Sequence, residues 1–298
     1  MMSERPDGFE AKRTDLGPGP IHYLDSGDRG NGETLVFVHG FGVNGRLWDG
    51  VADRLREDAR CILPDWPMGS HPEAMRPDAD LTPPAQARLV SEFLRSVDLD
   101  GATIVGNDSG GAVSQMLVTR HPERIARLVL TICDCFENFP PEPFKTMFKG
   151  LRVPGAPAAF ARSLKVSAIR RGPLAYGKLT SRPMEEATIR AFVDPMIHDT
   201  GVRDDAMRFV AGADARDTMD AASKLPDLQI PALLVWGAED TFFTIADARR
   251  LAELIPDGRL VEVSGARTFV PLDDPGRVAE EIAGFLAERP LPAGTASA

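Results

Sequence analysis

The chain alternates between short apolar runs and longer amphipathic stretches, and this alternation restricts the fold more than any other feature of the sequence. Residues 34–40 read TLVFVHG, a buried-strand pattern, and residues 46–55 then carry apolar side chains at helical spacing. Strand-like runs recur along the chain at residues 34–40, 60–66, 102–108, 126–133, 231–240 and 259–266. Apolar strands separated by helices predict an α/β fold, with a mostly parallel sheet covered by helices on both faces.

The alternation stops in the middle of the chain. From residue 136 to residue 228 no strong strand run appears, and the segment is rich in proline, phenylalanine and methionine at helical spacings. We therefore expect a core made of residues 1–135 and 229–290, with an inserted helical cap, or lid, at 136–228. The polar end of the chain, residues 291–298, is expected to be a disordered tail.

Composition excludes several classes of function. The net charge is -10 and the pI about 5.1, which argues against a nucleic-acid or anionic-membrane partner. No apolar run approaches the roughly 20 residues that span a bilayer, and the polar first residues do not resemble a signal peptide. We therefore expect a cytoplasmic protein.

Three cysteines, Cys61, Cys133 and Cys135, fit a reducing compartment. No second cysteine pair or histidine cluster accompanies Cys133-Asp134-Cys135, so we expect small residues at the end of a buried strand there, and neither a metal nor another cofactor.

The segment 104–112, IVGNDSGGA, reads as a strand that turns sharply into a helix. Such an elbow needs small residues two positions before and two after its central residue, because strand and helix backbones pass very close. With Asp108 at the centre these flanks are Gly106 and Gly110, whereas centring on Ser109 would place Asn107 in a glycine position. The spacing therefore assigns the nucleophile position to Asp108. The alternative is a turn aspartate that only caps the helix.

At this point the chain resembles the α/β-hydrolase superfamily. The resemblance rests on FVHGFGVNGRLWD, the elbow segment, LLVWGAEDTFF and FVPLDDPGRVAEEIAGFL, and it covers residues from about 20 to 290. An aspartate at the elbow is similar to the haloalkane dehalogenase and epoxide hydrolase branch. In that branch the carboxylate attacks an sp3 carbon, and a histidine-activated water hydrolyses the resulting ester. The resemblance also implies an oxyanion hole at the amides of Phe41 and Ser109.

The resemblance implies a histidine base in the loop after the last strand, but Thr268 stands in that position. His71 and His198 are the candidates to replace it. For the acid of the triad, Asp240 matches the usual site and Asp134 the alternative site that some dehalogenases use. Arg267, beside the vacated position, could pair with Asp108 or Asp240, bind a substrate anion, or be a solvated loop residue.

Other features of the two named activities are missing. Ser109 replaces the tryptophan that follows the nucleophile in dehalogenases, Phe41 replaces their asparagine, and Tyr176 is the single tyrosine of the insertion, whereas epoxide hydrolases use two. The aromatic and methionine side chains of the insertion suit a roof over an apolar pocket, although we expect only a few of them to line it. The predicted pocket residues are Phe41, Gly42, Ser109, Arg267, Phe136, Phe139, Tyr176 and His198.

Three functions follow from these residues. The first is a hydrolase that acts on a small-to-medium apolar organic substrate (C–halogen, epoxide or ester) through Asp108. The second is a lyase, cyclase or isomerase in which Asp108 is a general acid or base, since the water-activating histidine is absent. The third is an inert ligand-binding protein with the same pocket. The catalytic candidates are Asp108, Asp240, Asp134 and Thr268.

Overall fold

The structure is a computed structural model that describes residues 6–30 and 33–291. Its centre is an eight-stranded sheet with the order β1-β2-β4-β3-β5-β6-β7-β8. The strands are β1 (Glu10–Leu16), β2 (Gly19–Asp25), β3 (Thr34–Val38), β4 (Arg60–Pro64), β5 (Ala102–Asp108), β6 (Ile125–Cys133), β7 (Ala232–Gly237) and β8 (Gly258–Val263). From β4 to β8 every neighbouring pair is parallel. This confirms the predicted α/β fold with a mostly parallel sheet.

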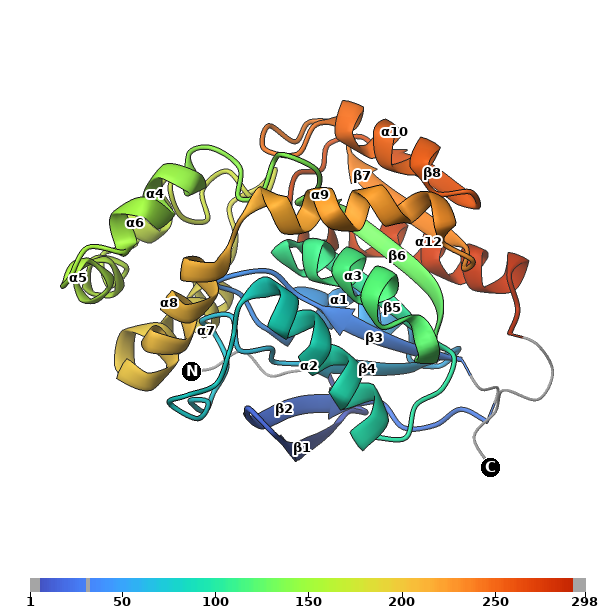
Figure 1. The fold of residues 1–298 in the computed structure, drawn as a ribbon, viewed down its shortest axis with the longest axis horizontal. Coiled ribbons are helices and arrows are strands. Elements are labelled where there is room, and N and C mark those ends of the chain that lie inside the picture. The colour runs from blue at the N-terminus through green and yellow to red at the C-terminus, as the bar shows by residue number, and fades with distance from the viewer. Residues whose placement is uncertain (1–5, 31–32, 292–298) are drawn as a thin grey trace.

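Helices cover both faces of the sheet (Figure 1). On one face α2 packs against α3 and α3 against α9, while α1 and α12 pack together on the other. The helices of these layers are α1 (Asp49–Leu55), α2 (Pro83–Ser96), α3 (Ser109–Arg120), α9 (Ala215–Lys224), α10 (Ile245–Leu254), α11 (Val270–Asp273) and α12 (Pro275–Glu288), with the 3-10 turns η1 (Gly45–Trp48), η2 (Pro122–Arg124) and η3 (Leu225–Asp227).

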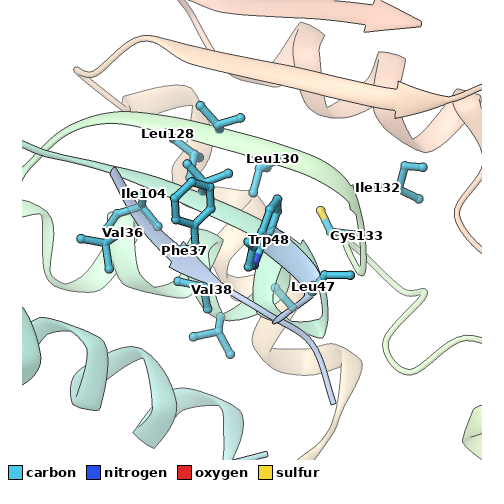
Figure 2. Close-up of a cluster of buried hydrophobic side chains, with 14 of the residues drawn as sticks. Val36, Phe37, Val38, Leu47, Trp48, Ile104, Leu128, Leu130, Ile132 and Cys133 are labelled. Atoms are coloured by element: carbon cyan, nitrogen blue, oxygen red, sulfur yellow. The ribbon is translucent and has the colours of Figure 1, made fainter. Parts of the chain in front are cut away.

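The strands at the centre are buried on both sides, as the apolar runs predict. Every residue of β3 is buried, and β5 is buried until its last residue. Figure 2 shows side chains of β3, β5 and β6 meeting Leu47 and Trp48 of η1 in one cluster. This packed centre fixes the positions at which the strands end, and therefore the positions of the residues that follow them.

An early strand around His22 was expected, but β1 and its antiparallel pairing with β2 at the edge of the sheet were not predicted. In β1 the side chains alternate between exposed and partly exposed, and none is buried, so the strand has no apolar face that the sequence could reveal. It extends the sheet through β2, which pairs with β4.

The insertion folds as helices beside the ends of the strands, in the left part of Figure 1. They are α4 (Phe144–Leu151), α5 (Ala156–Ser163), α6 (Ser167–Arg170), α7 (Glu186–His198) and α8 (Thr200–Gly212). The cap was predicted to end at residue 228. Because α9 packs along α3 in the layer that covers the sheet, we propose that the cap ends earlier, after α8. Apart from Leu291, the predicted disordered tail 291–298 lies outside the described residues.

Within the described part of the chain, no helix is both long enough and apolar enough to span a membrane.

The elbow between β5 and α3 is the most tightly constrained turn of the sheet. Asp108 has φ 54° and ψ -135°, a positive φ that side-chain-bearing residues rarely adopt. A Cβ on Gly110 would lie 2.3 Å from the carbonyl oxygen of Val38, and one on Gly106 would lie 2.9 Å from the Cα of Gly111. The two glycines thus stand where the backbones of β3, β5 and α3 meet.

Replacing Gly110 with alanine is therefore expected to destabilise the protein by about 3 kcal/mol or more, because the backbone of β3 must move to admit the methyl group. Gly284→Ala is the matched control. Gly284 lies exposed in α12 with no atom within 4 Å of an added Cβ, and the change should stabilise the helix by up to about 1 kcal/mol. Urea unfolding of both variants measures the difference. A Gly110→Ala protein as stable as the parent would contradict the close approach.

Candidate active site

Asp108 lies at the carboxyl end of β5 and at the amino end of α3. Its carboxylate packs against the turn after β3, where a Cβ on Gly40 would lie 2.5 Å from Oδ2 of Asp108. Part of the Asp108 surface faces a cavity, but the protein encloses that cavity closely enough to desolvate the carboxyl group. The backbone N–H of Ser109, in the first turn of α3, donates to this carboxylate.

Asp134 lies beside Asp108 because β5 and β6 end together. Asp108 is the register partner of Cys133, so the next residue of β6 reaches the same edge of the sheet. The backbone N–H of Asp134 lies 3.4 Å from the carbonyl oxygen of Asp108, and the two side chains are hydrogen bonded to each other. Asp134 is 1% exposed. Two carboxyl groups thus face one cavity in direct contact.

Above about pH 7 the two carboxyl groups hold one proton between them. Desolvation raises the pKa of Asp108 to about 7, although the Ser109 amide acts in the opposite direction. Burial, and then the charge of Asp108, raise the pKa of Asp134 well above its usual range. Two like charges in contact cannot both form in an apolar site. Asp134 therefore keeps the proton and donates it to the Asp108 carboxylate.

Asp240 and Thr268 are hydrogen bonded to each other. Thr268 is completely buried, and its Oγ1 donates to Oδ2 of Asp240 over 2.5 Å. The backbone N–H groups of Phe242 and Phe243 donate to Oδ1 of Asp240 over 2.8 and 2.6 Å. Burial nevertheless raises the pKa of Asp240. The hydroxyl of Thr268 thus donates to one carboxylate oxygen of Asp240, the expected triad acid. Neither residue lines the cavity.

The histidines of the chain all lie elsewhere. His71 is buried and bonds Asp205 over 2.8 Å, and His198 is exposed at the end of α7, so neither replaces the missing base. His39 is engaged in the turn after β3, where its Nε2 accepts from the N–H of Trp66 over 2.8 Å. His22 bonds Glu73, and His121 directly follows the last residue of α3. Throughout residues 6–30 and 33–291, no histidine lines the cavity.

The two amides expected to form the oxyanion hole have different partners. The N–H of Phe41 donates to Oγ of Ser109 over 2.7 Å, while the N–H of Ser109 donates to the Asp108 carboxylate. The Ser109 hydroxyl thus accepts from one of the expected donors, and its own hydrogen is left to donate toward the cavity or the carboxylate. The Ser109 amide therefore already donates to the Asp108 carboxylate, whereas the Phe41 amide donates to a hydroxyl.

The cavity has a volume of about 90 Å³, several times the ~10–15 Å³ that one water needs on the same measure. Its polar side chains are Asp108, Ser109, Asp134 and Tyr176, and the rest of its wall is apolar. Tyr176 comes from the cap and donates its hydroxyl to the carbonyl oxygen of Gly42. Burial, and then the charge of Asp108, raise the pKa of Tyr176, so the phenol stays protonated.

Five of the predicted pocket residues line the cavity: Phe41, Gly42, Ser109, Phe139 and Tyr176. The predictions for Phe136, Arg267 and His198 are wrong. The ring of Phe136 packs under the guanidinium of Arg250, and His198 faces solvent. Arg267 lines a second hollow with Arg171 and Arg182, and it is not part of the cavity wall that holds the two aspartates.

The cap contributes more of the wall than expected, and the sequence analysis missed Phe243 of the core. Phe243 directly follows the Asp240 turn, and the run TFFT was the available signal, since apolar residues in a loop at a strand end face inward. The cap residues that line the cavity are Phe139, Pro140, Pro141, Phe144, Met147, Phe148, Phe160, Leu164, Leu174, Ala175, Tyr176, Leu179, Phe192, Val193 and Met196.

Nothing in the described ranges suits a metal ion, since no group of three or more histidine, cysteine or acidic side chains is gathered there. Cys133 and Cys135 are buried, and burial raises the pKa of both thiols.

The raised pKa of Asp108 predicts a pH-dependent gain in stability for Asp108→Asn. An unfolded chain loses this proton near pH 3.8, whereas the folded protein keeps it until about pH 7. Raising the pH between these values therefore destabilises the parent. The advantage of the variant should grow over this interval and level off at about 2–4 kcal/mol near pH 8.

Thermal and urea unfolding from pH 4.5 to 8.5 measure this advantage. Asp78→Asn, at an exposed position, is the control and should show no such trend. An advantage of Asp108→Asn that shrinks with rising pH would contradict the desolvated carboxyl.

Comparison with known proteins agrees with this architecture. Residues 35–281 match the family described as the Alpha/beta hydrolase family. Haloalkane dehalogenase 2 of Mycobacterium tuberculosis (strain ATCC 25618 / H37Rv) is 27% identical over 291 residues, covering 92% of this chain and 94% of that protein.

Two solved structures share the fold. The haloalkane dehalogenase DbeA from Bradyrhizobium elkani USDA94 superposes with a TM-score of 0.78 at 18% identity, over 94% of this chain and 98% of that one. An alpha/beta hydrolase fold protein from Burkholderia ambifaria also gives 0.78, at 21% identity, over 94% and 99% of the two chains. The chain therefore belongs to the Alpha/beta hydrolase family and is a hydrolase-like enzyme.

Proposed function

We propose that this protein is a hydrolase that acts on a small apolar organic substrate through Asp108. The carboxylate attacks an sp3 carbon that carries a halogen or belongs to an epoxide. A C–O bond forms, and the bond to the leaving group breaks with its electron pair on that group. Water then adds to the carbonyl carbon of the Asp108 ester and releases the alcohol. With an activated ester the carboxylate would instead attack the acyl carbon, forming a mixed anhydride as the bond to the leaving alkoxide or phenolate breaks, and water would then hydrolyse the anhydride.

The observation that carries the proposal is the placement of Asp108. Its carboxylate stands at the elbow, under the amino end of α3, and faces a cavity whose remaining wall is almost entirely apolar. Water solvates a free carboxylate strongly and makes it a poor nucleophile. In this cavity a helix terminus and one amide replace that solvation, which leaves the carboxylate more reactive toward carbon.

The size of the cavity and the relatives support the substrate class. A volume of about 90 Å³ and an aromatic wall suit a compact apolar molecule and disfavour a polymer or a charged metabolite. The relatives described as haloalkane dehalogenases are similar over nearly the whole chain. The hydroxyl of Ser109 can stabilise a leaving halide or oxygen, because its hydrogen is not used by another described group, whereas Tyr176 donates its hydrogen to Gly42.

One observation favours a second function. With Thr268 at the base position and a shared proton at Asp108 and Asp134, the site also suits proton transfer without hydrolysis, as in an elimination, cyclisation or isomerisation. Such a reaction needs no water-activating histidine and forms no ester at Asp108.

Covalent labelling tests the first proposal. The protein is incubated with 1-bromobutane, 1,2-epoxybutane and 4-nitrophenyl acetate, and intact mass and product are followed over time. We expect product, or an adduct (alkyl from the first two probes, acetyl from the third), that disappears in Asp108→Asn. Because the attacking form is the anion, the initial rate of labelling should rise with pH through about 7. Neither product nor adduct with any probe would count against the hydrolase.

The substitution Thr268→His separates the two functions. The imidazole would stand beside Asp240, which already accepts a hydrogen bond from this position over 2.5 Å. For a hydrolase limited by ester hydrolysis, the new base should raise turnover by at least about tenfold. For a proton-transfer enzyme the substitution should give no gain on its substrate.

Thr268→Val is the control for this comparison, since it keeps the shape of threonine and removes the donor. It should lower stability by about 1–3 kcal/mol, because one oxygen of Asp240 loses its buried partner, and it should give no gain in turnover. Turnover of the two variants is compared on the probe that the parent converts best.

A further inference from the structure

We propose that Asp134 is a catalytic residue that acts as the base in the second half of the reaction. Once Asp108 carries an alkyl group, the Asp134 carboxylate removes a proton from the water that attacks the Asp108 ester. This inference rests on the hydrolase proposed above. In this role Asp134 accepts a proton itself, whereas the acid of a catalytic triad orients a histidine that accepts it.

The position of Asp134 satisfies the geometric requirement for a base. Its side chain lines the same cavity as Asp108 and is hydrogen bonded to it, so a water next to the Asp108 ester is also next to Asp134. Within the part of the chain that the structure describes, Oδ1 of Asp134 is buried and has no hydrogen-bond partner. This oxygen therefore keeps its capacity to accept a hydrogen bond, and a water beside the Asp108 ester reaches it after a small movement of the side chain.

The protein holds the main chain at Asp134 firmly. Nε2 of Gln115 donates to the carbonyl oxygen of Asp134 over 2.8 Å and to that of Gly111 over 3.1 Å. Gln115 belongs to α3, the helix that begins at the elbow, so one helix fixes the positions of both aspartates. Such a pair keeps its spacing when the Asp108 carboxylate becomes an ester.

No other side chain of the described cavity wall can act as this base. Asp240 lies outside the wall, and both of its oxygens are hydrogen bonded. Tyr176 donates to Gly42, and its raised pKa keeps it protonated. The described wall contains no histidine, lysine or glutamate. Asp134 is thus the one strong base that remains when Asp108 is alkylated.

Alkylation itself prepares Asp134 for this role. In the resting protein the charge of Asp108 contributes to the raised pKa of Asp134, so Asp134 carries the shared proton. An ester has no charge, so this repulsion ends when the alkyl group is transferred. The pKa of Asp134 then falls, so the fraction of molecules in which Asp134 has released its proton to solvent rises, and that proton and the halide amount to one molecule of acid. The remaining effect, burial, keeps its anion strongly basic.

The protons of the second half balance. Asp134 takes one proton from water, and the hydroxide adds to the carbonyl carbon of the ester. The intermediate then breaks its bond to the alkoxide, which takes the proton of the newly formed Asp108 carboxylic acid and leaves as the alcohol. Asp108 is again an anion and Asp134 is again protonated, which is the resting state. For an epoxide the same steps follow once its oxygen has taken up a proton.

The test is Asp134→Asn with 1-bromobutane as the probe. Asparagine keeps the shape of the side chain and, like protonated Asp134, can donate a hydrogen bond to Asp108, so alkylation should continue. Hydrolysis of the ester should slow by about 10²–10⁴-fold. The butyl adduct should then accumulate in intact mass spectra, map to Asp108, and be absent from Asp108→Asn. Asp134→Glu, which restores a carboxylate, should recover part of the release.

Release by Asp134→Asn within about threefold of the parent would overturn the inference, and so would an equally persistent adduct in the parent. Both results leave the proposed hydrolase standing, because the adduct still forms at Asp108. If no variant forms an adduct or product, the proposed function itself fails.

Should Asp134→Asn not fold, the pH profile of adduct decay in the parent decides. A base in the site predicts a rate that rises with pH and then becomes constant. A rate that rises tenfold with every pH unit would indicate hydroxide from solvent and would overturn the role of Asp134.

Discussion

The arrangement of the site depends on one close approach, between the start of α3 and the end of β3. Gly110 lies so near the carbonyl groups of Val38 and His39 that no side chain fits there. This contact forces the turn to be sharp and holds Asp108 at a positive φ. A sharp turn lifts the Asp108 carboxyl group clear of the sheet and into the cavity, where a normal helix cap would fold it back on the backbone.

The second constraint is electrostatic, and it follows from the first. A carboxyl group lifted into an apolar cavity loses its hydration, and β6 ends so that a second carboxyl group meets it there. The pair lowers its energy by sharing a proton and by accepting a hydrogen bond from the backbone N–H of Ser109. Two buried carboxyl groups lower the stability of the folded protein, a cost that active sites commonly carry. Aromatic rings of the cap cover the pair. Phe41, for example, packs against Phe148 of the cap at 5.1 Å between ring centres.

Much of the fold and part of the site could be predicted from the sequence because the signals are local. Buried strands such as Thr34–Val38 are continuous apolar runs, and the elbow is a spacing of glycines around one aspartate. The contact between Asp108 and Asp134 depends on the register of two strands, which no local pattern contains. Arg267 and Phe136 were misplaced for a related reason. The direction of a loop side chain is set by distant packing, as the stacking of Arg250 on Phe136 illustrates.

Thr268 connects these constraints with function. A threonine at this position bonds Asp240 as a histidine would, so the loop keeps its shape without a base. The carbonyl oxygen of Thr268 also accepts from Nδ2 of Asn107 over 2.7 Å, which ties the loop to the residue before Asp108. Thr268 cannot accept a proton near neutral pH, so this side of Asp108 offers no base, while the loop stays hydrogen bonded to the scaffold. Of the groups that the structure describes around the cavity, only Asp134, at the end of the neighbouring strand, is placed to move a proton to or from Asp108 or its ester. Both proposed reactions, hydrolysis and proton transfer, consequently depend on the same pair of carboxyl groups, and they differ in whether Asp108 bonds to carbon or only to hydrogen.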